Sequence, residues 1–543
     1  MASASRFHMT GVFADSARAV KTMLRGSWPG RCQLPCGTEL CTAKKSGTIN
    51  RPLGVRVPGD ERFLGKREQA IRADKPGLPL QRRGHTMQHT TLSRRDALTA
   101  AGAAAAAGCM RALGVAAATD SPQSPFLLSE QGCGRATGYA EANKIVTVGE
   151  RTHVAWLDSP PDGFRVRVRT FDRRAGQWSP TYTVGEAYDN HGGPALTVDS
   201  EGFLHVVYYP HHREMRYRKS KRAGDASEWE DEVAFGRRLT YPTLVCGKDD
   251  TLYLTARRSF SNRTWQVELW KRSRGEAWQR ERAILESRYR GYAHFQESLA
   301  WGPDHRTLHL CCRFHEKTDK EGYGRLQTVA YLVSPNAGET WQRSDGTAVS
   351  SPATVDSSEV LAGGGVDHQR ILRAGAMAVD SKGQPHLVYS VQERGSARLL
   401  IARPRGDGSW QRIDLTEFLP RQWASWNLTA PAGITFASRG EMVVTAQIQQ
   451  PKKGVSTWGN PTNEVVVFRS PDGGRSFSFA LIGRPNREQS HWLPNIERAT
   501  GHHRVPGRAP GLLYTAGRPG AKNTELLSNK VFFCTASPPK RQP

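Results

Sequence analysis

One motif recurs along most of the chain, and it constrains the fold more than any other feature of the sequence. The stretch VDSEGFLHVVY at 198–208 matches VDSKGQPHLVY at 379–389 in seven positions. Looser copies lie near residues 148, 248, 303, 438 and 509. Each copy is typical of a strand, a tight turn and a second strand. Repeats of roughly 50–70 residues indicate a series of small, similar sheets.

A small sheet cannot bury both of its faces alone, whereas radial packing of several sheets around an axis can do so. The sequence therefore predicts an all-β fold, a seven-bladed β-propeller, with a six-bladed ring as the alternative. We expect this domain to span residues 139–538. Propellers commonly close by pairing strands from the two ends of the chain, which predicts that Cys133 and Cys534 lie near each other.

Two turn motifs support this fold. SPDGGRSF at 470–477 and SPNAGETW at 334–341 resemble the Asp-box, a turn between the outer strands of sialidase-like propeller blades. The Asp or Asn side chain can bind turn backbone groups, Gly can adopt a positive φ, and the aromatic residue can pack between sheets. The motif marks the fold and is not a catalytic site.

The first part of the chain does not read as folded structure. Residues 1–86 lack a sustained hydrophobic period, and we interpret them as disordered or as a wrongly assigned extension. Residues 87–118 resemble a twin-arginine export signal, with Ser93-Arg94-Arg95-Asp96-Ala97-Leu98 before an alanine-rich stretch. Because such signals stand at a chain start, we expect the true start at Met87. Residues 119–138 would form a linker.

The signal predicts a periplasmic or extracellular protein. Cleavage could follow Ala118, or Cys109 could be lipidated as part of the weak lipobox Ala106–Cys109. No run of about eighteen apolar residues occurs, so no membrane-spanning helix is predicted.

The charge balance indicates the kind of partner. A net charge of +25 predicts a polyanionic partner. Zinc-finger spacing and RNP-like motifs do not occur in the sequence, which argues against nucleic acid. A membrane surface or an acidic glycan remains as the polyanion; we expect an anionic polysaccharide as the substrate, and we expect a monomeric protein.

Histidines flank the strands of the repeat, and hairpin geometry explains why. In an antiparallel hairpin, the residue numbers of each cross-strand pair add up to the same value, the index sum. The residue before the first strand therefore faces the residue after the second. Three successive copies then place polar pairs at one rim: His191 with His211 or His212, Tyr241 with Arg257 or Arg258, and His294 with His315. A shared rim in neighbouring blades predicts a ligand site.

These residue types suit proton abstraction beside a carboxylate. The C5 hydrogen of a uronate becomes acidic only when the carboxylate is neutralised. The guanidinium of Arg257 can neutralise it, because its fork pairs with a carboxylate. A histidine or tyrosine could then remove the C5 proton, and the same or another group could protonate O4. This reaction is β-elimination.

The stretch NHGGPALTVDSEGFLHVVYYPHHREMRYRKS at 190–220, followed by TYPTL at 240–244, resembles the BNR-repeat propellers that include ulvan lyases. That family cleaves a sulfated polysaccharide containing rhamnose and uronate. The resemblance implies active-site roles for four residues, His191, His211, Tyr241 and Arg257. It also implies a role for Tyr292, and further candidates for substrate binding are His212, Arg258 and Arg216. It does not assign the acid and the base.

The stretch HLCCRFH at 309–315 contains residue types that bind zinc. The candidate ligands are His294, His309, Cys311 and His315, and buried thiols with rim histidines are the alternative interpretation. We expect no cofactor to be required for catalysis, while a structural zinc or calcium ion is compatible with the sequence.

Two other functions fit the same pattern. One is a propeller glycoside hydrolase, rhamnosidase-like or sialidase-like, although the Arg-Ile-Pro sequence typical of sialidases does not occur. The other is a non-catalytic propeller that only binds glycans.

Overall fold

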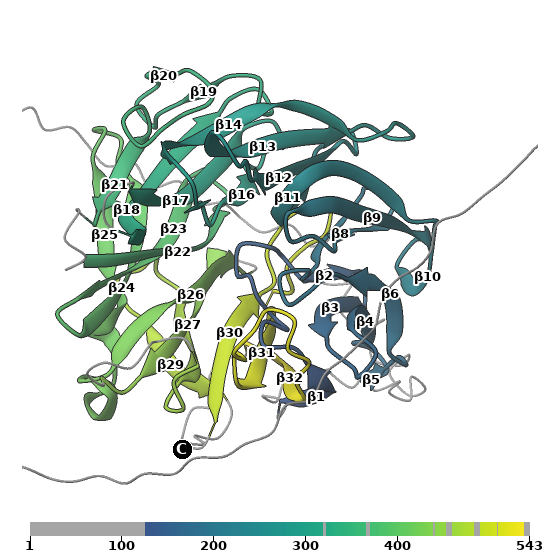
Figure 1. Cartoon of the computed structure of the whole chain (residues 1–543). Coiled ribbons are helices and arrows are strands. Elements are labelled where there is room, and N and C mark those ends of the chain that lie inside the picture. The colour runs from purple at the N-terminus through teal and green to yellow at the C-terminus, as the bar shows by residue number, and fades with distance from the viewer. Residues whose placement is uncertain are drawn as a thin grey trace, which may run out of the picture. The chain divides into compact units, whose positions relative to one another are not determined.

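Strands connected by turns make up nearly all of the part of the chain that the structure describes. The computed structural model describes residues 125–536 except 319–321, 365–369, 438–439, 452–458, 483–488 and 508. The predicted export signal, with Arg94, Arg95 and Cys109, lies outside the described residues. Within the described part, five hydrogen-bonded sheets are arranged around a common centre, as in a propeller (Figure 1).

The first sheet combines strands from both ends of the described chain. Its strands are β1 (Phe126–Gly132), β2 (Ile145–Val148), β3 (Arg151–Asp158), β4 (Phe164–Asp172), β5 (Gln177–Trp178), β6 (Tyr182–Ala187), β30 (Ser490–Ile496), β31 (Gly511–Gly517) and β32 (Asn529–Thr535).

The second sheet carries most of the predicted site residues. Its strands are β7 (Ala195–Val198), β8 (Leu204–Tyr208), β9 (Arg213–Arg222), β10 (Asp225–Trp229), β11 (Val233–Cys246), β12 (Leu252–Arg258), β13 (Thr264–Arg272) and β14 (Gln279–Arg290). The long strand β11 pairs with both β9 and β12, so it joins two groups of strands.

Three further sheets complete the arrangement. One contains β15 (Ala293–His294), β16 (Ser298–Trp301), β17 (Leu308–Thr318), β18 (Gly322–Ser334), β19 (Trp341–Gln342), β20 (Ala348–Val349) and β21 (Glu359–Gly363). The next contains β22 (Arg370–Val379), β23 (Pro385–Glu393), β24 (Ser396–Pro404) and β25 (Trp410–Asp414), followed by the short 3-10 helices η1 (Leu415–Phe418) and η2 (Arg421–Trp423). The last contains β26 (Asn427–Phe436), β27 (Met442–Gln449), β28 (Glu464–Ser470) and β29 (Ser478–Ile482).

Burial follows the position of a strand within its sheet. All residues of β27 and β28 are buried, because sheets pack on both faces of these strands. In β4 the buried residues Phe164, Val166 and Val168 alternate with partly exposed arginines, as expected for a strand near the outer edge. No helix in the described residues is long and apolar enough to cross a membrane.

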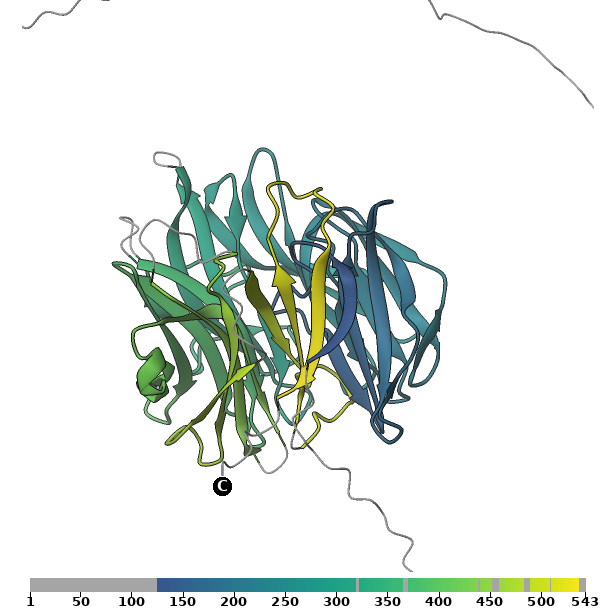
Figure 2. The same cartoon turned by 90° about the horizontal axis from the view of Figure 1, so that it is seen from below.

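The two ends of the described chain pair directly, as the propeller prediction requires. Strand β1 lies beside β32, with Phe126 opposite Phe533 and Gly132 opposite Asn529 (Figures 1 and 2). Strand β1 falls within residues 119–138, so the prediction that this whole segment is a linker is wrong.

The predicted proximity of Cys133 and Cys534 is also wrong. The backbone carbonyl of Cys133 accepts a hydrogen bond from Asn529, at one end of β32, whereas Cys534 lies near the other end. Five residues of extended strand span roughly 17 Å. Both thiols are free and buried.

The predicted hairpins agree closely with the observed register. The β7–β8 pair has Ala195 opposite Val207, which gives the index sum of 402 that the turn position predicted. The copy near residue 509 differs, because β30 and β31 are joined by the long segment 497–510 and not by a tight turn.

Both Asp-box motifs adopt the expected local geometry. Asp472 Oδ1 accepts hydrogen bonds from the backbone N–H groups of Arg475 and Ser476, at 3.0 Å each. Asn336 Oδ1 accepts the corresponding bond from the N–H of Thr340 at 2.9 Å. Gly474 has a φ of 89°, which explains the glycine at this position. The motifs join β28 to β29 and β18 to β19.

We predict that replacing Phe533 by Ala will destabilise the pairing of β1 with β32, which joins the two ends of the described chain. Phe533 is 1% exposed, and its ring lies edge-on to Trp178 at 5.0 Å between centroids. The loss of a buried phenyl ring should lower the free energy of unfolding by about 3–5 kcal/mol. Chemical denaturation of Phe533→Ala and of the half-buried neighbour Phe532→Ala measures this. Equal losses in the two variants would contradict the prediction.

Candidate active site

Three neighbouring hairpins place their strand ends at one rim. Thr240 pairs with Arg257 between β11 and β12, and His294 pairs with His315 between β15 and β17. When the β7–β8 register is extended by four residues beyond Ala195 and Val207, His191 faces His211. A bulge in β11 lies between Thr240 and Thr243. The three predicted pairs thus lie at the same ends of their strands.

Ring contacts connect the pairs to one another. The rings of His191 and His211 stack with 3.8 Å between centroids. The ring of Tyr241 lies 5.9 Å from that of His191 and 4.4 Å from that of His294. The structure therefore gathers these side chains into one cluster and does not scatter them around the ring.

Asp189 orients both histidines, and the sequence interpretation missed it. Its Oδ1 atom lies 3.0 Å from His191 Nδ1, and its Oδ2 atom lies 2.6 Å from His211 Nδ1. Asp189 precedes His191 by two residues, and its Oδ1 atom also accepts the His191 backbone N–H at 2.8 Å. This local turn, Asp-Asn-His, was the available sequence signal.

The charge on Asp189 fixes the tautomer of both histidines. Burial opposes its ionisation, but the hydrogen bonds from His191 and His211 outweigh burial and hold the pKa of Asp189 below its usual range. An ionised carboxylate can only accept hydrogen bonds, so both Nδ1 atoms carry protons. Burial, together with Arg135 and His211, lowers the pKa of His191 to about 3. His191 is therefore neutral at pH 7, with Nε2 as a proton acceptor.

Tyr241 is held in an unusual backbone conformation. Its φ is 61°, in the left-handed region that non-glycine residues rarely adopt, and such positions cluster at functional sites. Burial and the neighbouring Tyr292 raise the pKa of Tyr241 to about 12, although Arg257 and Arg135 oppose this shift. The phenol therefore carries its proton at neutral pH.

Arg257 is a buried cation surrounded by aromatic rings. Its Cζ atom lies 4.5 Å from the ring centroid of Tyr241, 4.8 Å from that of Trp265 and 5.5 Å from that of Tyr292. Its Nη1 atom donates to the carbonyl of Ala293 at 3.4 Å. Among the described residues, Nε and Nη2 have no hydrogen-bond partner, and Arg257 makes no salt bridge.

Solvent access differs among the four residues that the sequence singled out. Arg257 is 0% exposed and His191 is 5% exposed, whereas His211 and Tyr241 are half-buried. The prediction that these residues meet at one rim is therefore correct, but the structure buries both Arg257 and His191. An anion can reach Arg257 only when one of the covering aromatic rings moves.

A second tyrosine, Tyr139, lies inside the cluster and was not predicted. Its ring meets Tyr241 edge-on at 4.7 Å, and its hydroxyl accepts a hydrogen bond from Arg135 at 2.7 Å. Tyr139 lies in the loop between β1 and β2, far along the chain from the hairpins, so hairpin register could not reveal it.

Tyr241 borders a small cavity of about 10 Å³, which Tyr139, Glu141 and Glu297 also help to line. Burial raises the pKa of Glu297 to about 8. A cavity of this size is just large enough for one water molecule.

The predicted substrate-binding residues fall into two groups. Tyr292 and His212 belong to the cluster, since their rings lie 5.2 Å and 5.4 Å from that of Trp265. Arg258 instead forms a salt bridge with the buried Glu268 at 2.9 Å, and Arg216 forms one with Glu232 at 3.0 Å.

The suggested zinc ligands do not converge. His309 and His315 lie six residues apart on β17, roughly 20 Å along an extended strand. His309 Nδ1 is hydrogen-bonded to the Tyr331 hydroxyl at 2.7 Å, and Cys311 is buried. Within the described residues, the groups that could hold a metal ion are Asp189 with His191 and His211, and Cys246 with Asp250 and His502.

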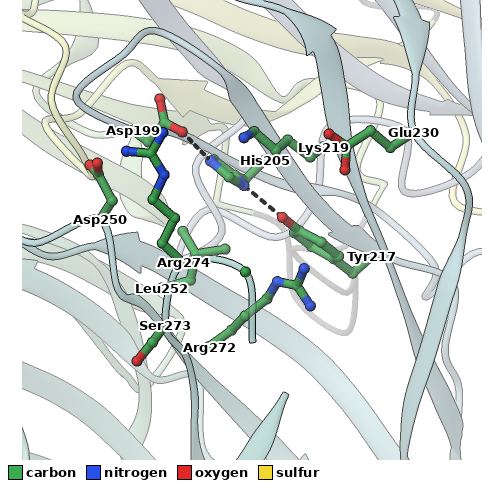
Figure 3. A pocket seen from close by; sticks show the side chains of 11 residues that line it. Asp199, His205, Tyr217, Lys219, Glu230, Asp250, Leu252, Arg272, Ser273 and Arg274 are labelled. Carbon is green, nitrogen blue, oxygen red and sulfur yellow. Dashed lines mark hydrogen bonds and ion pairs between the residues drawn. The ribbon is translucent and has the colours of Figure 1, made fainter. Parts of the chain in front are cut away.

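A second hollow, of about 250 Å³, is lined by side chains that include His205 and Tyr217 (Figure 3). Asp199 and Asp250, which also line it, lie in the β7–β8 and β11–β12 turns, at the opposite ends of these strands from the candidate site. In it, His205 contacts the Tyr217 hydroxyl at 2.8 Å and Asp199 Oδ2 at 3.1 Å. His309 and Tyr331 form the same His–Tyr contact in another sheet. Because the contact recurs with the repeat, we interpret it as structural.

Comparison with known proteins identifies a family and several relatives. The profile of the BNR repeat-containing family matches residues 138–418. An ulvan lyase of family PL25 from Pseudoalteromonas sp. (strain PLSV) is 21% identical over 366 residues, which cover 60% of this chain and 71% of that protein. An ulvan lyase from Nonlabens ulvanivorans is 22% identical over 407 residues, covering 65% of this chain and 79% of that protein.

Solved structures show the same fold. A PL25 ulvan lyase bound to -[GlcA(1-4)Rha3S]- has a TM-score of 0.58 at 14% identity, covering 76% of this chain and 96% of that structure. The polysaccharide lyase Uly1 has a TM-score of 0.51 at 13% identity, covering 76% of this chain and 99% of that structure.

We predict that the protein loses stability in mild acid. Burial is the main cause that lowers the pKa of nine histidines, His153, His191, His205, His212, His294, His305, His309, His386 and His503. Below the ordinary histidine pKa of 6.5, these histidines bind more protons in the unfolded chain than in the folded protein. Their contribution to the free energy of unfolding is therefore complete above pH 6.5 and declines towards pH 4. Four carboxyl groups whose pKa values burial raises act in the opposite direction but are fewer, namely Glu141, Asp158, Glu297 and Glu497.

Calorimetry between pH 7 and pH 4.5 should show the Tm falling by roughly 10 °C. A Tm that stays constant or rises over this range would contradict the assignment of these histidines as buried and neutral.

Proposed function

Since this chain belongs to the BNR repeat-containing family, we propose that it is a polysaccharide lyase. It cleaves a uronate-containing, sulfated, ulvan-like glycan by β-elimination. The relatives named as ulvan lyases support the substrate class. The observation that carries the proposal is the buried Arg257 beside Tyr241, whose Nε and Nη2 atoms have no hydrogen-bond partner among the described residues.

We infer that the sheets form seven blades. Seven successive strand groups support this number: β2–β6, β7–β10, β11–β14, β15–β21, β22–β25, β26–β29, and β30–β32 with β1. In this arrangement β11 begins as an outer strand of one blade and continues as the inner strand of the next.

Arg257 neutralises the uronate carboxylate in this mechanism. The covering ring of Trp265 or Tyr292 swings aside, and the carboxylate accepts hydrogen bonds from Nε and Nη2 of Arg257. Pairing a buried cation with an anion in a site of low dielectric is strongly favourable. Neutralisation stabilises the negative charge that develops when the C5 proton leaves.

The histidine pair acts as the base. Asp189 holds both Nδ1–H groups, so the Nε2 atoms of His191 and His211 are free to accept the C5 proton. His211 is the more exposed of the two and is therefore the partner that meets the sugar. The imidazolium that forms is stabilised by Asp189.

Tyr241 acts as the acid. With a pKa of about 12, its phenol is protonated at neutral pH and can donate to O4 as the C4–O4 bond breaks. The electrons of the C5–H bond form the C4–C5 double bond, and O4 leaves with the proton. The guanidinium supplies the cation that the reaction needs, so we propose no catalytic cofactor.

We also propose that the protein is exported. The twin-arginine-like segment within residues 87–118 supports a periplasmic or extracellular location. An extracellular location suits a polysaccharide substrate that is too large to cross a membrane.

A direct assay tests the reaction type. Incubation with ulvan should produce ultraviolet absorbance from unsaturated sugar ends, because β-elimination creates a double bond conjugated to the carboxylate. New reducing ends without this absorbance would indicate a hydrolase, and retention on the glycan without cleavage would indicate a binding protein. Either result would contradict the proposal.

Substitutions test the residue roles in the same assay. Arg257→Met keeps much of the side-chain volume and removes the charge, and Tyr241→Phe removes only the hydroxyl. Each should reduce kcat by roughly 10²–10⁴-fold. Arg258→Met, at the neighbouring salt bridge, serves as the matched control for Arg257 and should retain most activity. Full activity of Arg257→Met at an unchanged Tm would exclude the neutralising role.

A further inference from the structure

An arginine-rich groove opens beside the candidate active site. Its volume is about 330 Å³, and its charged lining consists of Arg213, Glu214, Arg216, Arg237 and Arg238. Four guanidinium groups against one carboxylate make this hollow strongly positive. A positive concave surface of this kind attracts anions.

A bulge of β11 presents two of these arginines. The register with β9 shifts between Phe235, opposite Met215, and Leu239, opposite Arg213, so β11 carries two extra residues there. Gly236 has a φ of 69° and Arg238 a φ of 57°, so the backbone turns sharply through the left-handed region. Bulges typically redirect side chains near functional sites.

The arginines of the groove differ in whether they already have partners. Arg216 forms a salt bridge with Glu232 at 3.0 Å, and Arg213 donates to the Tyr188 hydroxyl at 3.0 Å. Arg237 and Arg238 are exposed, and no side-chain hydrogen bond or salt bridge of theirs is found among the described residues. Because Arg237 and Arg238 both line the groove, an anion bound there would face two cations that have no acidic partner among the described residues.

The groove is continuous with the catalytic cluster. His212 lines the groove, and its ring lies 4.5 Å from that of His211. Ser259 joins the two regions, because its Oγ atom lies 2.7 Å from His212 Nδ1 and its backbone N–H donates to the Arg238 carbonyl at 3.1 Å. A sugar chain with one residue at His211 can therefore extend its next residues over Arg237 and Arg238.

We propose that this groove is an anion-binding subsite that holds an oxyanion group, a sulfate ester or a carboxylate, on the sugar next to the bond that is cleaved. The inference rests on the proposed lyase function and assigns Arg237 and Arg238 as residues that bind and position the polymer. The planar forks of these arginines suit both oxyanions. Because they do not touch the reacting atoms, they contribute to KM and not to kcat.

The test compares Arg237→Gln/Arg238→Gln with a matched control, Arg174→Gln/Arg405→Gln. The control removes the same charge from exposed arginines in turns outside the groove. Initial rates are measured by ultraviolet absorbance on native and on chemically desulfated ulvan. The groove variant should raise KM on the native polymer about tenfold with kcat within about twofold, and the control should leave both unchanged.

The desulfated polymer identifies the anion. A KM increase confined to the native polymer assigns the groove to a sulfate ester, and an equal increase on both polymers assigns it to a carboxylate. An unchanged KM on both polymers, or a fall in kcat alone, would overturn the proposal.

Calorimetric titration separates this proposal from the lyase function. In the Tyr241→Phe background, binding of native ulvan should weaken about tenfold when Arg237→Gln/Arg238→Gln is added. If the wild-type protein forms no unsaturated ends but this binding loss occurs, the lyase reaction is wrong and the subsite stands. If cleavage occurs and binding is unaffected by the groove substitutions, the subsite is wrong and the lyase reaction stands.

Discussion

The proposed site depends on a buried guanidinium that has no acidic partner within the described part of the chain. Most buried charges in proteins are paired, because an isolated one is costly. Arg257 is instead surrounded by the faces of Tyr241, Trp265 and Tyr292, which offset part of that cost through cation–π attraction. Two of its donors remain unused among the described residues. A carboxylate that enters this position completes an ion pair that the fold leaves unfinished.

Electrostatic interactions also determine the properties of the groups beside Arg257. One carboxylate, Asp189, binds the Nδ1–H groups of two histidines and fixes both tautomers, and burial keeps His191 neutral beside the protonated phenol of Tyr241. An acid and a base with pKa values pushed apart by their surroundings are typical of elimination and proton-transfer sites. The groove lined by Arg237 and Arg238 then accounts for part of the net charge of +25 as a surface for a polyanion.

Much of this arrangement could be predicted from the sequence, because the position of the turn determines which residues of a hairpin pair. A turn position fixes the index sum, and the sum places His191 at His211 and His294 at His315 without any knowledge of side-chain packing. Contacts between distant segments could not be obtained in this way. Tyr139 enters from a loop of another strand group, the covering of Arg257 depends on three ring orientations, and β1 lies in a stretch without the repeat pattern. The mistaken placement of Cys534 has the same origin, since pairing of the chain ends was expected but its register was not.

The most direct test of the central claim is a crystal structure of the Tyr241→Phe variant with a bound ulvan oligosaccharide. The account predicts that a uronate carboxylate lies within about 3 Å of Arg257 Nε and Nη2, with Trp265 or Tyr292 displaced from its present position. A bound oligosaccharide whose carboxylates all lie elsewhere, with Arg257 still covered by the three rings, would contradict it.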